Sequence, residues 1–149
     1  MASDLLLRDL AGNDLDDLLA LYRSLHSNEE RVETTRAAEI WAEILSDSRQ
    51  LYLGGFVGDL LVVACAVAII PNLTRGGRPY AVIENVVTAA PFRRRGYGAT
   101  LLRAAINRCW LGDCYKIMLM SAADRAGAHQ FYESLGFDRQ SKQAFVLKR

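Results

Sequence analysis

The feature of this sequence that most constrains its fold is a long, largely apolar stretch interrupted by one Gly-Asp pair. Residues 51–70 read LYLGGFVGDLLVVACAVAII, and Gly58-Asp59 separates the two apolar runs. Such a pair between two strand-like runs predicts a β-hairpin. The second run, Leu60–Ile70, is apolar almost throughout, so we expect its strand to be buried on both faces.

The remaining hydrophobic patterns place helices and further strands on both sides of this hairpin. Apolar or β-branched runs predict strands at residues 5–8, 80–88, 115–120 and 144–147. Helical spacing predicts helices at residues 14–25, 35–45, 98–111 and 124–135. The order β-α-α-β-β-β-α-β-α-β predicts an α/β (α+β) fold in one domain, residues 1–149, with a mixed sheet flanked by about four helices.

Composition narrows the classes of function. The chain has 149 residues and a formal net charge of +1, which disfavours a globally basic nucleic-acid binder. Its three cysteines form no CxxC spacing and its two histidines lie far apart, so we expect no metal site and reduced, structural thiols. The longest apolar run is too short for a membrane span of roughly 20 residues. The acidic N-terminal stretch does not resemble a secretory signal, so we expect a cytoplasmic protein.

The densest positive charge lies at a predicted strand-to-helix turn. Residues 91–102 read PFRRRGYGATLL. The first turn of a helix offers N–H groups without internal partners, and glycine lets them approach an anion closely. With three arginines beside them, a pyrophosphate site is predicted. A solvated charge run and a nucleic-acid contact are the alternatives; GxGxxG is incomplete here, and a P-loop lysine is missing.

Three short stretches make the sequence similar to the GNAT superfamily of N-acetyltransferases. RRRGYGA, Arg93–Ala99, resembles the family's acyl-CoA pyrophosphate loop, and IENVVT, Ile83–Thr88, resembles the strand before it. FYESLGF, Phe131–Phe137, resembles the family's terminal motif. DCYKIML, Asp113–Leu119, is similar to a strand of glucosamine-6-phosphate N-acetyltransferases.

The resemblance implies a binding site for acetyl-CoA as co-substrate and no metal. Strands 80–88 and 115–120 would splay apart to admit the thioester. The pantetheine arm would pair with the backbone of Val86, Val87 and Thr88. The pyrophosphate would be held by Arg93, Arg94, Arg95, Gly96, Tyr97, Gly98, Ala99 and Thr100. Relatives often carry an asparagine where this chain has Arg125, which would contact a phosphate or remain solvated.

Two residues are candidates for the chemistry of acetyl transfer. The resemblance places the Tyr132 phenol near the sulfur, and a phenol with a reference pKa of about 10 is protonated at pH 7 and can donate to the leaving thiolate. Glu84 interrupts an apolar strand, and burial there would raise its pKa toward the range useful for a base. It would act directly, through water, or by orienting the amine; an edge carboxylate or a structural ion pair is the alternative. Asn85 is expected on the opposite face of the strand.

The predicted function is direct transfer of an acetyl group from acetyl-CoA to a primary amine of a small molecule or peptide. The first two helices and residues 24–35 would form the acceptor wall, and the glutamates there would suit a cationic acceptor. The alternative is a non-catalytic acyl-CoA-binding or regulatory module. No nucleic-acid or membrane partner is expected. The resemblance allows a homodimer paired through the C-terminal strand, and the identity of the acceptor stays open.

Overall fold

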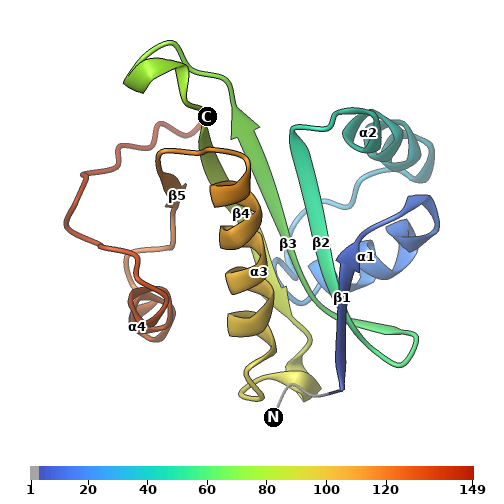
Figure 1. Cartoon of the computed structure of the whole chain (residues 1–149). Coiled ribbons are helices and arrows are strands. Elements are labelled where there is room, and N and C mark those ends of the chain that lie inside the picture. The colour runs from blue at the N-terminus through green and yellow to red at the C-terminus, as the bar shows by residue number, and fades with distance from the viewer. Residues whose placement is uncertain (1–3) are drawn as a thin grey trace. The chain divides into compact units, whose positions relative to one another are not determined.

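The computed structural model describes residues 4–149 and contains one mixed, mostly antiparallel sheet (Figure 1). Its five strands follow one another in chain order: β1 (Leu5–Asp9), β2 (Gln50–Val57), β3 (Leu60–Ile70), β4 (Tyr80–Thr88) and β5 (Ile117–Leu119). The first four pair antiparallel, and β2 and β3 form the predicted hairpin, with Gly58 at a φ of 58°. Residues 61–67 of β3 are all buried, which confirms that this strand is covered on both faces.

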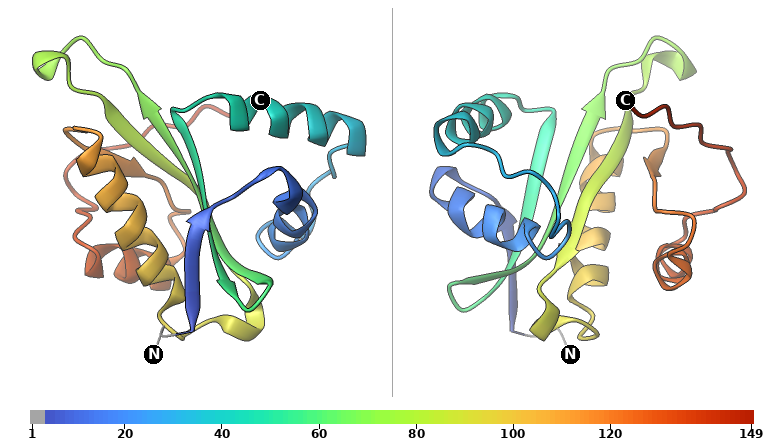
Figure 2. Two further views of the ribbon diagram at one scale, coloured as in Figure 1. Left: turned by 45° about the vertical axis from the view of Figure 1, so that its right-hand side comes forward. Right: turned by 180° about the vertical axis from the view of Figure 1, so that it is seen from behind.

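Residues 4–149 contain four α-helices: α1 (Leu15–Tyr22), α2 (Thr34–Ser46), α3 (Tyr97–Leu111) and α4 (Ala126–Ser134). α1 and α2 lie on one face of strands β1–β4, and α3 lies on the other face (Figures 1 and 2). The chain divides into two compact units, one ending at Met118 and the other spanning Leu119–Arg149, which contains α4.

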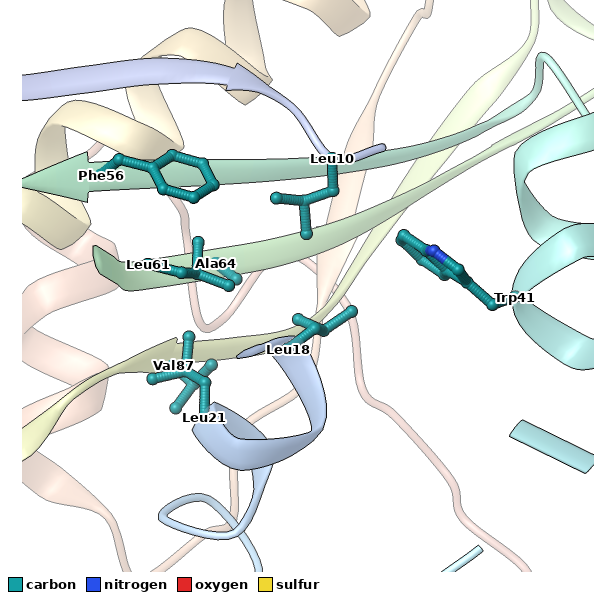
Figure 3. Packing of buried hydrophobic residues seen from close by; sticks show 8 residues of the cluster. All are labelled: Leu10, Leu18, Leu21, Trp41, Phe56, Leu61, Ala64 and Val87. Carbon is teal, nitrogen blue, oxygen red and sulfur yellow. The ribbon is translucent and has the colours of Figure 1, made fainter. Parts of the chain in front are cut away.

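A hydrophobic cluster joins α1 and α2 to the sheet (Figure 3). Its buried members are Leu10, Leu18, Leu21, Trp41, Phe56, Leu61, Ala64 and Val87. Tyr22 and Tyr52 pack against this cluster, and the rings of Trp41 and Tyr52 meet edge to face with centroids 5.3 Å apart. On the opposite face, α3 contributes side chains with no measurable exposure: Leu101, Leu102, Ala105 and Cys109. The β2–β4 region is therefore held between two apolar layers.

An internal ion pair fixes the entry into α1. Asp14 is 4% exposed, and its carboxylate accepts hydrogen bonds from the Arg8 guanidinium at 2.7 and 2.9 Å and from the Ala11 N–H at 2.6 Å. The Arg8 guanidinium also lies over the Phe56 ring, 4.0 Å from its centroid. Asp14 precedes α1 but does not cap it with its side chain, because its oxygens bind β1 and the loop before the helix instead.

Several predicted bounds differ from those of the structure. α1 ends at Tyr22 rather than residue 25, α4 begins at Ala126 rather than residue 124, and β5 spans only Ile117–Leu119 rather than residues 115–120. The predicted strand at 144–147 is wrong: this stretch has no strand structure, and Phe145 and Leu147 are 90% and 100% exposed. An apolar, β-branched pattern supplies strand propensity, but a strand also requires a neighbouring strand with which to pair.

Within residues 4–149, no helix has both the length and the apolar character needed to cross a membrane. The same residues contain no group of three or more His, Cys, Asp or Glu side chains arranged to hold a metal ion.

Candidate active site

The arginine–glycine turn is the strand-to-helix connection that the sequence predicts. After β4, a single 3₁₀ turn at Ala90–Phe92 leads into the arginines, and α3 begins at Tyr97. Gly96 precedes the helix with a φ of 81°, in the left-handed region that only glycine adopts readily. No atom lies within 4 Å of the position that a Cβ on Gly96 would occupy, so this glycine serves the backbone conformation rather than close packing.

The first turn of α3 has unpaired amides at its start. Among residues 4–149, no side chain caps the helix, and the first backbone bond within it runs from the Thr100 N–H to the Gly96 carbonyl at 3.0 Å. The N–H groups of Tyr97, Gly98 and Ala99 come before that bond and have no carbonyl within the helix. Together with the partial positive charge of the helix terminus, they form an arrangement that suits an anion.

The three arginines are positioned in different ways. Arg93 donates from Nε to the Thr88 carbonyl at 3.1 Å, and Arg95 donates to the Pro91 carbonyl at 3.2 Å. Arg94 is exposed and has a φ of 60°. Among the described residues, none of the three forms a salt bridge, so their positive charge is not neutralised by a neighbouring carboxylate. The basic groups therefore remain available beside the unpaired amides.

Tyr97 contributes to this turn through its backbone only. Its side chain is 3% exposed, and its hydroxyl donates to the Asp4 carboxylate at 2.9 Å. That hydrogen bond fastens the start of α3 to the segment before β1. A phenol held in this way does not face an incoming ligand, whereas the N–H group of the same residue lies in the uncapped first turn.

β4 presents an open backbone edge near the turn. The Ala89 N–H bonds to the Val62 carbonyl of β3, so by the alternation of antiparallel pairing the N–H and C=O of Thr88 point away from β3. The Thr88 carbonyl accepts the hydrogen bond from Arg93, so the N–H is the group of Thr88 that an added chain could meet. Bonds between the β4 and β5 segments lie at the other end of β4, where the Ala81 N–H meets the Lys116 carbonyl at 3.0 Å. This supports the predicted divergence of the two strands toward the end at Thr88, where an extended ligand could pair.

A hollow of about 210 Å³ lies on the face of the sheet that carries Tyr52, the residue whose ring contacts Trp41 of α2. It is lined by Gln50, Tyr52, Ala66, Val67, Ala68, Val82, Glu84 and Asn85. The residues on the central strand β3 explain its shape. Ala66 of β3 lies between its paired residues, Tyr52 of β2 and Glu84 of β4, and Ala68, two residues further along β3, faces the same side. Alanine leaves space where neighbouring strands carry larger side chains, so the centre of this face is recessed.

A β-bulge in β4 brings two polar side chains to this hollow. Ala64 pairs with Val87 and Ala66 with Glu84, so two steps along β3 match three steps along β4. The extra residue disrupts the alternation of faces, and Asn85 takes a φ of 53°. Consecutive residues Glu84 and Asn85 therefore both line the hollow. The expectation that Asn85 faces the opposite side was wrong. Asparagine tolerates positive φ, so its presence in an apolar strand was the sequence signal for this bulge.

Glu84 is exposed. The expectation that this side chain is buried in the strand was wrong. Within residues 4–149, its carboxylate forms no salt bridge or hydrogen bond, so a structural ion pair does not explain its presence. It stands at the rim of the hollow, where it can accept hydrogen bonds from an ammonium group.

Tyr132 and Arg125 belong to the second compact unit. Tyr132 lies in α4, is partly buried, and contacts the rings of Phe131 and Phe137 at centroid distances of 5.4 and 6.2 Å. Arg125 is the exposed residue that precedes this helix. The predicted roles of both residues toward acetyl-CoA stay predictions.

The cysteines and histidines are described by their burial and their contacts. All three cysteines are free and buried. Burial raises the pKa of Cys65 to about 12 and that of Cys109 to about 11, so both are protonated thiols at neutral pH and poor nucleophiles. His26 is exposed near Glu29, and the His129 Nε2 lies 2.8 Å from the Ala122 carbonyl.

Comparison with known proteins identifies the family. Residues 15–137 match the acetyltransferase (GNAT) family model, so the chain belongs to this family, whose members use acetyl-CoA. A glucosamine 6-phosphate N-acetyltransferase of Trypanosoma brucei brucei is 34% identical over 83 residues, which cover 56% of this chain and 54% of that protein. The chain thus matches about half the length of this relative.

Solved structures agree with this family and fold. A protein of Agrobacterium tumefaciens str. C58, named as a candidate acetyltransferase, is 38% identical with a TM-score of 0.92, over 97% of this chain and 99% of that one. A transcriptional regulator of Bacillus halodurans C-125 is 27% identical with a TM-score of 0.88, over 97% and 99% of the two chains.

Proposed function

We propose that this chain transfers the acetyl group of acetyl-CoA directly to a primary amine of a small molecule or peptide. The observation that carries the proposal is the uncapped start of α3 beside three unneutralised arginines, next to the open edge of β4. These groups fit a pyrophosphate and an extended pantetheine chain, respectively. The hollow beside Glu84 supplies a place for the acceptor.

Binding and orientation would account for much of the rate. The backbone of Val86, Val87 and Thr88 would hold the pantetheine arm, and the turn from Arg93 to Thr100 would hold the pyrophosphate. Arg125 would contact a phosphate group or remain solvated. Two substrates held together need no acyl-enzyme, because proximity replaces a bimolecular encounter. The protonated, buried state of Cys65 and Cys109 supports direct transfer over a cysteine nucleophile.

The proton transfers are assigned to two side chains. Glu84 would accept the proton of the ammonium, directly or through a water molecule, or would orient the amine. The free amine then attacks the thioester carbonyl, and the bond to sulfur breaks. Tyr132, assigned by the family motif, would donate its phenolic proton to the departing thiolate, and the second proton that the nitrogen loses as the amide forms would restore the phenol.

Free-thiol release with acetyl-CoA and a panel of amines tests the transferase function. Calorimetry with coenzyme A tests the binding site separately. We expect heat on binding and amine-dependent release of thiol. Absence of any binding heat and of any thermal stabilisation at millimolar coenzyme A would contradict the proposed site.

A regulatory acyl-CoA-binding module is the second candidate function. The 27% identity to a transcriptional regulator over nearly the whole chain favours it. The module would bind coenzyme A through the turn before α3 but would release no thiol with any amine. The same two measurements therefore separate the two functions.

We also propose that the chain forms a homodimer. The apolar side chains of Phe145, Val146 and Leu147 are 63–100% exposed, and exposed apolar clusters commonly mark interaction surfaces. Light scattering coupled to size-exclusion chromatography is expected to give twice the 16.6 kDa chain mass, and a Phe145→Glu, Leu147→Glu variant is expected to give the monomer mass. A monomer mass for the parent chain would refute the dimer.

A further inference from the structure

Two polar contacts fasten β1 to α3, one at each end of the strand. The Tyr97 hydroxyl lies 2.9 and 3.0 Å from the two carboxylate oxygens of Asp4, the residue before β1, and donates to them. At the other end, the Arg108 guanidinium donates to the Asp9 carboxylate at 2.8 and 3.4 Å. Tyr97 begins α3, and Arg108 lies in its last turn. The strand and the helix therefore run in the same direction (Figures 1 and 2).

The lengths of the two elements match these contacts. Asp4 and Asp9 are five positions apart, which in extended chain spans about 17 Å. Tyr97 and Arg108 are eleven positions apart, which in an α-helix spans about 16.5 Å. Because the two spans agree, both contacts form without bending either element. The segment that starts at Asp4 therefore sets the position of the first turn of α3.

The contact between Asp4 and Tyr97 is connected to the groups that would bind the diphosphate. Tyr97 offers a ligand only its backbone N–H, but its side chain determines where that backbone lies. The Tyr97 ring lies 6.4 Å from the Phe92 ring between centroids, and the Arg95 guanidinium lies 5.2 Å from the Phe92 centroid. A hydrogen bond outside the site thus supports an amide and a guanidinium group within it.

The charge of Asp4 indicates what kind of role this residue has. A carboxylate near a site for a diphosphate repels the ligand, because the two charges have the same sign. Asp4 therefore cannot assist binding through its own contact with the ligand. It can assist only through the backbone conformation that its hydrogen bond stabilises.

We propose that the hydrogen bond from Tyr97 to Asp4 holds the start of α3 in the conformation that binds the diphosphate, before the ligand arrives. This inference rests on the proposed acyl-CoA site. Asp4 and the Tyr97 side chain are positioning residues, and neither side chain touches the ligand. Their effect on affinity arises because amides that are already ordered lose less conformational freedom when the ligand binds.

Two neutral replacements of Asp4 separate positioning from charge. Asp4→Asn keeps an oxygen that accepts from the Tyr97 hydroxyl, whereas Asp4→Ala removes it, and both remove the negative charge. We expect Asp4→Ala to bind coenzyme A about 3- to 10-fold more weakly than Asp4→Asn in calorimetry, a loss comparable to that of one hydrogen bond. In a Tyr97→Phe background the donor is absent, so the two Asp4 variants are expected to bind equally.

A truncated ligand and a control variant separate positioning from folding. Pantetheine, which lacks the diphosphate, is expected to bind Asp4→Ala and Asp4→Asn equally in ligand-observed NMR titrations. Asp9→Ala breaks the contact with Arg108 at the far end of β1. It is expected to lower the melting temperature and to leave coenzyme A affinity within about twofold of the parent, since charges farther apart than about 10 Å are largely screened.

The possible results are distinguishable. Equal coenzyme A affinities of Asp4→Ala and Asp4→Asn overturn the inference, even where Asp4→Ala melts at a lower temperature, because the contact is then structural only. An equal loss of pantetheine binding, or an equal loss of coenzyme A affinity in Asp9→Ala, also overturns it. All three results leave the acyl-CoA site intact, whereas a parent chain that does not bind coenzyme A contradicts that site and this inference with it.

Discussion

Gly96 offers a quantitative test of the anion site, because its backbone conformation can be changed without a steric clash. Its φ of 81° lies in the left-handed region, and an added Cβ meets no atom within 4 Å. Left-handed backbone costs a residue with a Cβ roughly 1–2 kcal/mol. Alanine also lowers the entropy of the unfolded chain, which offsets about 0.4–1 kcal/mol of that cost. Gly96→Ala is therefore expected to lower the free energy of unfolding by about 1 kcal/mol, or the melting temperature by about 2–4 °C.

The effect on ligand binding should exceed the effect on stability. Relief of the strain rotates the peptide before Tyr97 and misdirects the unpaired amides of the first turn of α3. Loss of one charge-assisted hydrogen bond of about 1.5 kcal/mol weakens binding roughly tenfold. Calorimetry with coenzyme A measures this loss, and thermal unfolding measures the stability.

Gly58 provides a matched control for this experiment. It has a φ of 58° in the β2–β3 hairpin, and the space around it is also open. Gly58→Ala is expected to lower stability as much as Gly96→Ala and to leave coenzyme A affinity unchanged. If Gly96→Ala binds coenzyme A as tightly as the parent chain despite the expected loss of stability, the turn before α3 does not hold the diphosphate.

Four further substitutions give distinct expectations. Tyr132→Phe is expected to lower kcat by tenfold or more with little change in the calorimetric affinity for acetyl-CoA, because proton donation contributes about 10²–10⁴-fold to such reactions; an unchanged kcat would remove Tyr132 as the acid. Glu84→Gln is expected to shift the pH profile of kcat/KM, and an identical profile would exclude Glu84 as the base. The Arg8 guanidinium lowers the pKa of Asp14 in the folded chain, so Asp14 stabilises the fold above its unfolded pKa of about 3.9, and this contribution is lost as the pH falls through the folded pKa. Urea titrations should show Asp14→Asn less stable by about 1–3 kcal/mol at pH 7, with a difference that shrinks in acid; equal loss at every pH would contradict the linkage. Gly54→Ala places a Cβ 2.5 and 2.8 Å from two leucine methyl carbons and is expected to cost about 1–3 kcal/mol by urea unfolding, whereas unchanged stability would mean that the core accommodates the methyl group.

The central part of the fold was predictable because local and long-range signals agree there. β4 occupies residues 80–88 as predicted, since its β-branched pattern is followed by Pro91 and by the arginines. The β2–β3 hairpin was predictable because the Gly58-Asp59 pair favours a tight turn with left-handed backbone. The strand-to-helix turn was likewise predictable, since glycine and a following apolar helical stripe mark the same boundary.

The errors arose where tertiary pairing overrides local pattern. The strand predicted at 144–147 lacks a pairing partner among residues 4–149, although its side chains favour extended structure. The bulge at Asn85 depends on the register between β3 and β4, which no single-strand pattern specifies. Burial of Glu84 was inferred from its apolar neighbours, whereas the recess above Ala66 leaves the carboxylate exposed.

The alanines at the base of the hollow have a consequence for the proposed acceptor site. Ala66 and Ala68 belong to β3, which pairs antiparallel with β2 on one side and with β4 on the other. Neither alanine forms part of the turn that precedes α3. Replacing one methyl group with a valine or leucine side chain would make the recess shallower while leaving the arginines and the helix start untouched. Under the proposed function, separate residues would therefore set the size of the amine and bind the acyl donor, so that one could diversify during evolution, or be redesigned, while the other is conserved.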